Sequence, residues 1–181
     1  MAQREPVTRQ RIDKFLRELG KRYRGAGRLY LTGGSQLTYA GFTHQTEDID
    51  YVVQLEGDQQ EFTRAVRSLI RDMNLSLEPA GPGDFIPLPE GWEDRSRHIG
   101  RYGRLDVFTF DPISTALSKI ERGTSRDIDG VLALLNAGII SVPELEEAYQ
   151  EIVPRLETEA LRVDEADFQR KVDAFLRLAQ E

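Results

Sequence analysis

Apolar residues recur every three to four positions along most of the chain, which is the spacing of helices with one buried side. The first such stretch covers residues 8–24, and its apolar positions are Ile12, Phe15, Leu16, Leu19 and Tyr23. A second begins at Asp58, which forms a capping-box pattern with Glu61, and runs to about Asn74. After Asp111 and a following proline, the spacing predicts about four more helices, which begin near residues 112, 125, 141 and 164.

Between these helices, shorter stretches have the pattern of β-strands. Residues 29–32 form an apolar run that stops at a Gly-Gly-Ser turn, and residues 36–40 follow as a short helix. Residues 46–55 and 104–110 alternate between apolar and polar side chains, and residues 75–78 predict another short strand. Residues 79–103 are rich in glycine and proline, so we expect a long irregular connection there.

This order of elements predicts an α+β fold. We expect a mixed β-sheet core with its N-terminal helix in residues 1–112, and a helical C-terminal lobe in residues 113–181. The 181 residues are enough for one domain with an appendage or for two small domains.

The composition is that of a globular protein, and it narrows the possible chemistry. Cysteine is absent and the only histidines are His44 and His98, which excludes thiolate and histidine-rich metal sites. Any metal must therefore be held by carboxylates. No apolar run approaches the roughly 18 residues of a membrane span, and no apolar block follows the charges at the N-terminus. We therefore expect a cytoplasmic protein with no membrane partner and no leader.

Charge is distributed unevenly along the chain. There are 24 basic and 31 acidic residues, which gives a net charge of −7. Residues 1–28 nevertheless hold nine basic and three acidic residues, whereas residues 144–181 hold five and eleven. Such a protein is unsuited to coating nucleic acid in bulk, but its basic segment is suited to holding one phosphate-rich ligand.

Three aspartates stand at suggestive positions in the predicted strands. Asp48 and Asp50 are two residues apart in one strand, so their side chains project to the same face. Asp106 lies in a later strand, and if that strand pairs next to the first, the three carboxylates converge. Converging carboxylates repel each other unless a cation that prefers oxygen ligands, Mg²⁺ or Mn²⁺, lies between them. Two such ions can activate an attacking hydroxyl and neutralise a leaving pyrophosphate.

The glycine turn supplies complementary chemistry. Gly33 and Gly34 allow a phosphate to approach the backbone between a strand and a helix, and Ser35 adds a hydroxyl donor. Each motif taken alone also has an ordinary explanation. A Gly-Gly-Ser turn is common between a strand and a helix, and a pair such as Asp48 and Asp50 is found on the solvated face of an edge strand. The turn is not a nucleotide-binding P-loop, because no Gly-Lys-Ser/Thr follows, and Gly-x-Ser-x-Gly is also absent.

The combination of these motifs resembles the signature of the nucleotidyltransferase (DNA polymerase β-like) superfamily. The matching segments are Leu-Tyr-Leu-Thr-Gly-Gly-Ser and Glu-Asp-Ile-Asp-Tyr-Val-Val, with Asp48 thirteen positions after Ser35 and a third acid at Asp106. The resemblance covers about residues 28–137 and includes Lys119 and the Arg126-Asp127 pair. It is closest to the minimal bacterial nucleotidyltransferases that include abortive-infection and MenT-like toxins of type IV toxin–antitoxin systems.

The resemblance implies roles for individual residues. It implies that Asp48 and Asp50 ligate the metals and that Asp106 assists as a ligand or general base. It also implies that the triphosphate binds at the glycine turn, Gly33, Gly34 and Ser35, and that the phosphates contact Lys119. Arg122 and Arg126 extend Lys119 into a basic row if the helix is continuous, and this row is either a phosphate contact or a solvated face.

The predicted activity is Mg²⁺-dependent (or Mn²⁺-dependent) transfer of a nucleoside monophosphate from a nucleoside triphosphate to a hydroxyl. The sequence does not choose the acceptor, which is tRNA or another RNA end, a protein side chain or a small molecule. If the protein is a toxin, a cognate antitoxin is a further partner. The alternatives are a catalytically silent nucleotide-binding regulatory module of the same fold, and an interaction protein that docks through its acidic C-terminal helix.

Overall fold

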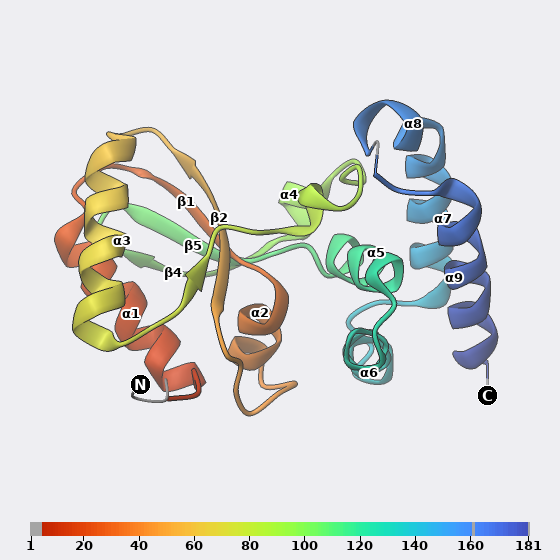
Figure 1. Ribbon diagram of the computed structural model, residues 1–181, viewed down its shortest axis with the longest axis horizontal. Helices are drawn as coiled ribbons and strands as arrows, with labels where there is room; N and C mark the ends of the chain where they lie inside the picture. Colours follow the sequence, from red (N-terminus) through yellow and green to blue (C-terminus); the bar gives the residue numbers. More distant parts are fainter. Residues whose placement is uncertain (1–4, 161, 181) are drawn as a thin grey trace. The chain divides into compact units, whose positions relative to one another are not determined.

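The computed structural model describes residues 5–160 and 162–180. Its contacts divide the chain into two compact units (Figure 1). Unit 1 consists of residues 1–80 and 96–110, and unit 2 of residues 81–95 and 111–181. The start of the chain, where we predicted no leader, lies partly outside the described residues. None of the described helices is long and apolar enough to cross a membrane.

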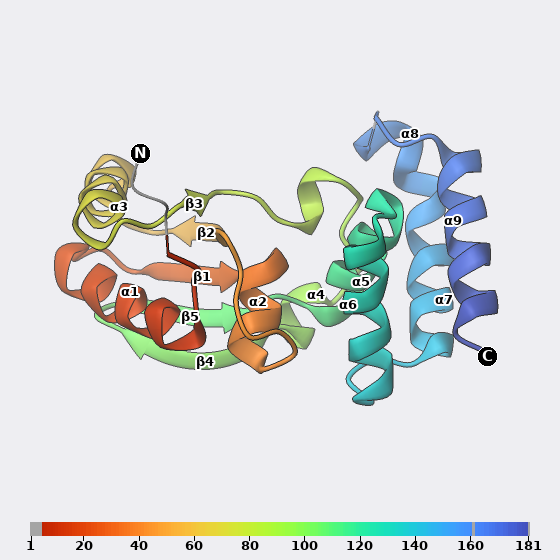
Figure 2. The ribbon, with the colours of Figure 1, turned by 60° about the horizontal axis from the view of Figure 1, so that its bottom comes forward.

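Unit 1 combines three helices with the whole β-sheet. Its elements are α1 (Arg9–Arg22), β1 (Gly27–Leu31), α2 (Gly33–Ala40), β2 (Ile49–Leu55), α3 (Gln59–Met73), β3 (Leu77–Glu78), β4 (Arg97–Tyr102) and β5 (Leu105–Thr109). The strand order is β3-β2-β1-β5-β4. The sheet is mixed, because β1 is antiparallel to β2 and parallel to β5 (Figure 2). The α+β fold with a mixed sheet is therefore confirmed.

One face of this sheet forms the core of unit 1. Leu29 and Leu31 of β1, together with alternate residues of β2 and β5, pack against the apolar sides of α1 and α3. The two helices are amphipathic and are held at their N-termini by Thr8 and Asp58, whose side chains accept backbone N–H groups. Because side chains alternate along a strand, the residues between these core positions point to the opposite face.

We call this opposite side of the sheet the open face. It is made by Asp50, Val52 and Gln54 of β2, Arg28 and Tyr30 of β1, Asp106 and Phe108 of β5, and His98 and Arg101 of β4. Arg28, Gln54, His98 and Arg101 are exposed, the central Tyr30 is buried, and the others are half-buried. The open face is therefore largely accessible to solvent and carries both acidic and basic groups.

Unit 2 is helical. Its elements are η1 (Pro82–Asp84), α4 (Trp92–Arg95), α5 (Pro112–Arg122), α6 (Ser125–Asn136), α7 (Val142–Ile152), η2 (Val153–Arg155), α8 (Leu156–Glu159) and α9 (Glu165–Leu178). Helix α5 is central and packs against α4, α6, α7, α9 and η1. Its middle is buried on all sides, which explains a sequence of small and apolar residues from Ile113 to Ile120.

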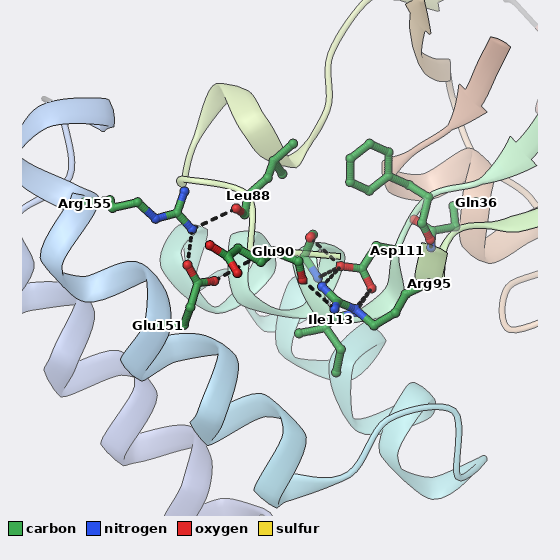
Figure 3. Close-up of polar contacts among 10 residues, drawn as sticks. Gln36, Leu88, Glu90, Arg95, Asp111, Ile113, Glu151 and Arg155 are labelled. Carbon is green, nitrogen blue, oxygen red and sulfur yellow. Dashed lines mark hydrogen bonds and ion pairs between the residues drawn. The ribbon is translucent and has the colours of Figure 1, made fainter. Parts of the chain in front are cut away.

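An ion pair between the buried Asp111 and the exposed Arg95 anchors the N-terminus of α5 within unit 2. Asp111, which is fully buried, accepts the backbone N–H groups of Ile113 and Ser114 and also a bidentate pair from Arg95, at 3.0 and 2.9 Å (Figure 3). The same close-up shows Arg155 joined to the carbonyl of Leu88 and to Glu151. These contacts hold segment 81–95 against the helices of unit 2.

Segment 79–103 is the part where our prediction of an irregular connection is wrong. Residues 81–95 contribute η1 and α4 to unit 2, and Arg97–Tyr102 forms β4 at the edge of the sheet. The register of β4 shifts between His98 and Gly100. This irregularity disrupts the alternation that marks a strand in a sequence.

Candidate functional site

The glycine turn forms the first turn of α2. Thr32 precedes the helix in an extended conformation, and Gly33 has a φ of +52°, in the left-handed region that favours glycine. A Cβ at Gly33 would lie 2.5 Å from Oδ2 of Asp50, and one at Gly34 would lie 2.4 Å from Oγ1 of Thr46. Both glycines are therefore required by the close approach of β2 and the segment before it.

Asp50 contacts the N-terminus of this helix directly. Its Oδ2 accepts a hydrogen bond from the backbone N–H of Gly34 at 3.2 Å. The N-terminal N–H groups of a helix have no acceptor within the helix and carry partial positive charge, so they attract anions. A carboxylate, the kind of ligand that Mg²⁺ prefers, and a helix terminus that attracts anions are thus adjacent in unit 1.

Buried polar contacts fix the position of α2. The hydroxyl of Ser35 is fully buried and lies within hydrogen-bonding distance of the carbonyl oxygens of Thr32 and Asp50, at 2.8 and 2.7 Å. The side chain of Gln36 donates to the carbonyl of Phe110 at 2.6 Å. We predicted that the Ser35 hydroxyl faces a phosphate, but the structure uses it to join α2 to β2.

Asp48 lies one residue before β2 begins, so the predicted strand starts three residues later than residue 46. Asp48 and Asp50 are both half-buried and flank the buried Ile49. The segment that leads to them is fixed by Thr46, whose backbone pairs with Val7 through two hydrogen bonds of 2.8 and 2.9 Å. No motif in the sequence indicates this role of Thr46.

These carboxylates fit a Mg²⁺ ion that arrives with a nucleotide. The described residues contain no group of three or more acidic or histidine side chains that would hold a metal ion by themselves. Mg²⁺ commonly binds through one or two carboxylates together with phosphate oxygens of the substrate and water. Asp48 and Asp50 are two carboxylates of this kind, and Asp50 lies at the N-terminus of α2, which attracts anions.

Asp106 does not join this pair. Its strand, β5, pairs with β1 rather than with β2, and Asp106 stands opposite Arg28, whereas Thr32 of the same chain segment stands beside Asp50. Arg28 and Thr32 are four residues apart, which corresponds to about 13 Å along the strand. Oδ1 of Asp106 instead lies 3.2 Å from Nε2 of His98. The expected convergence of three carboxylates therefore does not occur, because β1 separates the two strands and the register offsets them.

The basic residues predicted to contact phosphates lie in unit 2. Lys119 is almost fully buried, and its Nζ donates to Oδ1 of Asp127 at 3.0 Å. Arg122 lies 3.3 Å from the other oxygen of Asp127. Gly123, with a φ of +69°, ends α5, so Arg126 belongs to α6 and the continuous basic row does not form. Lys119, Arg122 and Arg126 as phosphate contacts stay a prediction.

Asp127 makes the stability of unit 2 dependent on pH. Burial alone would raise its pKa, but hydrogen bonds from Thr124 and Lys119, with the charges of Lys119 and Arg122, lower the pKa below its ordinary 3.8. A depressed folded-state pKa stabilises the fold above the unfolded pKa, and this contribution is lost as the pH falls through the folded value.

We therefore expect the urea midpoint of unit 2 to fall as the pH drops below about 4. Trp92, the only tryptophan, lies in unit 2 and reports its unfolding by fluorescence. Asp127→Asn should remove part of this acid dependence. An unchanged profile in the variant would contradict the assigned role of Asp127.

The close approach at Gly34 makes a second prediction. Gly34→Ala places a Cβ against Thr46 and should destabilise unit 1 by about 1–3 kcal/mol, as overpacking does in other cores, and weaken nucleotide binding. Thermal unfolding and titration with a nucleoside triphosphate measure the two effects. The double variant Gly34→Ala/Thr46→Ala removes the clash and should recover most of the stability. Equal loss in both variants would show that the clash is not the cause.

Comparison with known proteins now identifies the family. Residues 9–174 match the family described as "Nucleotidyltransferase of unknown function (DUF6036)". The chain belongs to this nucleotidyltransferase family. No curated protein and no solved structure matches the chain. The match confirms the superfamily that the motifs resemble, and the MenT-like subtype stays a prediction.

The family match extends over both units, so the DUF6036 region includes α1 and the helices of unit 2 as well as the sheet. Within this region, no sequence motif indicated the contacts that the structure shows for Thr46, His98 and Asp127. The Arg126-Asp127 pair was visible as a motif, but its salt bridge to Lys119 depends on how α5 and α6 pack.

Proposed function

We propose that this DUF6036 nucleotidyltransferase transfers a nucleoside monophosphate from a nucleoside triphosphate to a hydroxyl acceptor in a Mg²⁺-dependent reaction. The observation that carries the proposal is the contact between Asp50 and the backbone N–H of Gly34. It brings a cation-binding carboxylate and an anion-binding helix terminus within one hydrogen bond of each other, and a Mg²⁺-bound triphosphate needs both.

The residues of the site divide the work. Asp48 and Asp50 hold the cation, and the N–H groups at the start of α2 orient the phosphates. When bound, Mg²⁺ polarises the phosphoryl oxygens and neutralises the charge of the leaving group. The acceptor oxygen bonds to the α-phosphorus while the bond to the bridging oxygen breaks. Pyrophosphate leaves, and the hydroxyl proton passes to solvent.

The contacts around the site keep its residues in place. Ser35 and Gln36 hold α2, while Val7 and Thr46 hold the segment before Asp48. Positioning of this kind supplies much of the rate enhancement when the transferred group needs only alignment and charge stabilisation. Lys119, Arg122 and Arg126 stay proposed phosphate contacts, and the toxin role and antitoxin partner rest on the resemblance alone.

Transfer of label tests the activity. Each of the four α-labelled nucleoside triphosphates is offered with Mg²⁺ to the purified protein, with and without total RNA. We expect label to reach a macromolecule with at least one nucleotide and to be lost when EDTA removes the cation. Nucleotide binding without transfer to RNA, protein or small hydroxyl compounds would contradict the proposal and favour the catalytically silent regulatory module.

A further inference from the structure

The open face of the sheet changes in chemistry from one end to the other. The acidic end contains Asp50, beside the start of α2. The middle row across the strands consists of Val52, Tyr30, Phe108 and His98. The far row consists of Gln54, Arg28, Asp106 and Arg101. The face therefore runs from a cation-binding end, over an aromatic middle, to a row with two arginines.

The far row is basic despite Asp106. Arg28 and Arg101 are exposed and stand on either side of Asp106, one on each neighbouring strand. Arg104, also exposed, lies at the same end, because its carbonyl oxygen accepts a hydrogen bond from Gly27 at the start of β1. The exposed Glu56 also lies at this end, because its backbone N–H donates to the carbonyl of Ala26. Three arginines against two carboxylates still favour an anionic partner, which stands out in a chain with a net charge of −7.

The middle row offers aromatic surface. The ring of Phe108 stacks on Tyr30 with centroids 5.1 Å apart, and the ring of His98 meets its edge at 5.1 Å. The guanidinium of Arg28 lies 5.9 Å from the Phe108 centroid. Val52 and Phe108 are half-buried, so apolar atoms reach solvent between the acidic and basic ends. Aromatic and arginine groups beside a basic row are the groups that bind unpaired bases.

We propose that the open face binds the acceptor as the end of a single-stranded nucleic acid. Its terminal hydroxyl lies at Asp50, its bases pack against Val52 and Phe108, and its phosphates contact Arg28 and Arg101. This inference rests on the proposed function, because it assigns the acceptor of that same reaction. Asp106, paired with His98 between the two arginines, then belongs to the acceptor surface and not to the metal site.

The length of the face supports a polymer over a small molecule. The far row and Asp50 are about 13 Å apart along the strands, which matches about four stacked nucleotides at about 3.4 Å each. One nucleotide or sugar does not reach both ends. A protein side chain carries no regular phosphates for the two arginines.

Binding of a short RNA tests the surface. The full chain is titrated against a 5′-fluorescein-labelled RNA hexamer of mixed sequence, and fluorescence anisotropy is followed at several salt concentrations. We expect Arg28→Ala/Arg101→Ala to weaken binding about tenfold or more and to reduce the salt slope by about 1.4, the value for two contacts to a single strand. Arg28→Lys/Arg101→Lys keeps both charges and should retain most of the affinity.

A matched control removes the same charge from the other side of the sheet. Arg64 and Arg67 are exposed on α3, which packs against the core face, so Arg64→Ala/Arg67→Ala should leave hexamer binding unchanged. Equal weakening by both double variants would overturn the proposal, because the effect would then be one of net charge. Absence of hexamer binding to the unaltered protein would also overturn it.

Nucleotide binding separates this inference from the proposed function. Titration of the same variants with Mg²⁺ and a nucleoside triphosphate reports on the site at Asp50, which is independent of Arg28 and Arg101. Normal triphosphate binding with arginine-independent hexamer binding would overturn the acceptor surface alone. Arginine-dependent hexamer binding without Mg²⁺-dependent triphosphate binding would instead overturn the proposed function.

Discussion

Asp50→Asn is expected to lower Mg²⁺-dependent nucleotidyl transfer by about a thousandfold or more. Loss of a cation ligand removes several kcal/mol of charge stabilisation in the transition state, and about 4 kcal/mol corresponds to that factor. The amide is nearly isosteric with the carboxylate and still offers an oxygen to the N–H of Gly34, so the fold should be retained. Initial rates of label transfer measure the effect, and thermal unfolding checks the fold.

Asp106→Asn is the matched control for this prediction. It makes the same chemical change on the same face, at a position about 13 Å away along the strands. We expect a loss of no more than about tenfold, the size of one weakened contact. If Asp106→Asn abolished transfer as completely as Asp50→Asn, Asp106 would be part of the metal site. The separation of Asp106 from Asp50 that we infer from the strand register would then be wrong.

Asp111→Ala is expected to cause the largest loss of stability, about 2–3 kcal/mol in the free energy of unfolding of unit 2, the size expected for a lost helix cap together with a charge-assisted hydrogen bond from an exposed arginine. Asp111 is fully buried and accepts bonds from Arg95 and from two backbone N–H groups of α5. Removing it leaves Arg95 without its charge partner and two helix-terminal N–H groups without an acceptor. The hydrogen bond from Arg95 to Asp111 raises the pKa of the Arg95 guanidinium above its ordinary value.

Urea unfolding followed by Trp92 fluorescence measures this loss in unit 2. Asp164→Ala provides a control, because Asp164 is an exposed helix cap that accepts the backbone N–H of Asp167. The ion pairs among the described residues do not include Asp164. Loss of a cap alone costs about 1 kcal/mol. Similar losses in the two variants would mean that the Arg95 ion pair adds nothing to stability.

Local sequence signals predicted most elements because they act within a few residues. The apolar spacing located α1 and α3, and caps such as Asp58 and Asp111 marked where helices begin. Strand β4 was missed, because it is an edge strand with a register shift and exposed Arg97, His98 and Arg101. Its pairing with β5 is a tertiary contact that no local pattern records.

The candidate site was predictable only in part, for a similar reason. Their complementary chemistry and the family signature that they resemble indicated that Asp50 and the glycine turn belong together, and the structure places Gly34 against Asp50. Alternation placed Asp106 on a strand face, but strand order and register decide its neighbours, and these place it beside His98. Helix α2 starts three residues earlier than the predicted short helix, so Ser35 lies in its first turn, where its hydroxyl bonds to the carbonyl of Thr32.

A structure of the protein with Mn²⁺ and a non-hydrolysable nucleoside triphosphate tests the central claim most directly. We expect anomalous density for the cation at Asp48 and Asp50, with the triphosphate against the backbone N–H groups at the start of α2. A cation and triphosphate bound anywhere else, with Asp50 still hydrogen-bonded to Gly34, would contradict it.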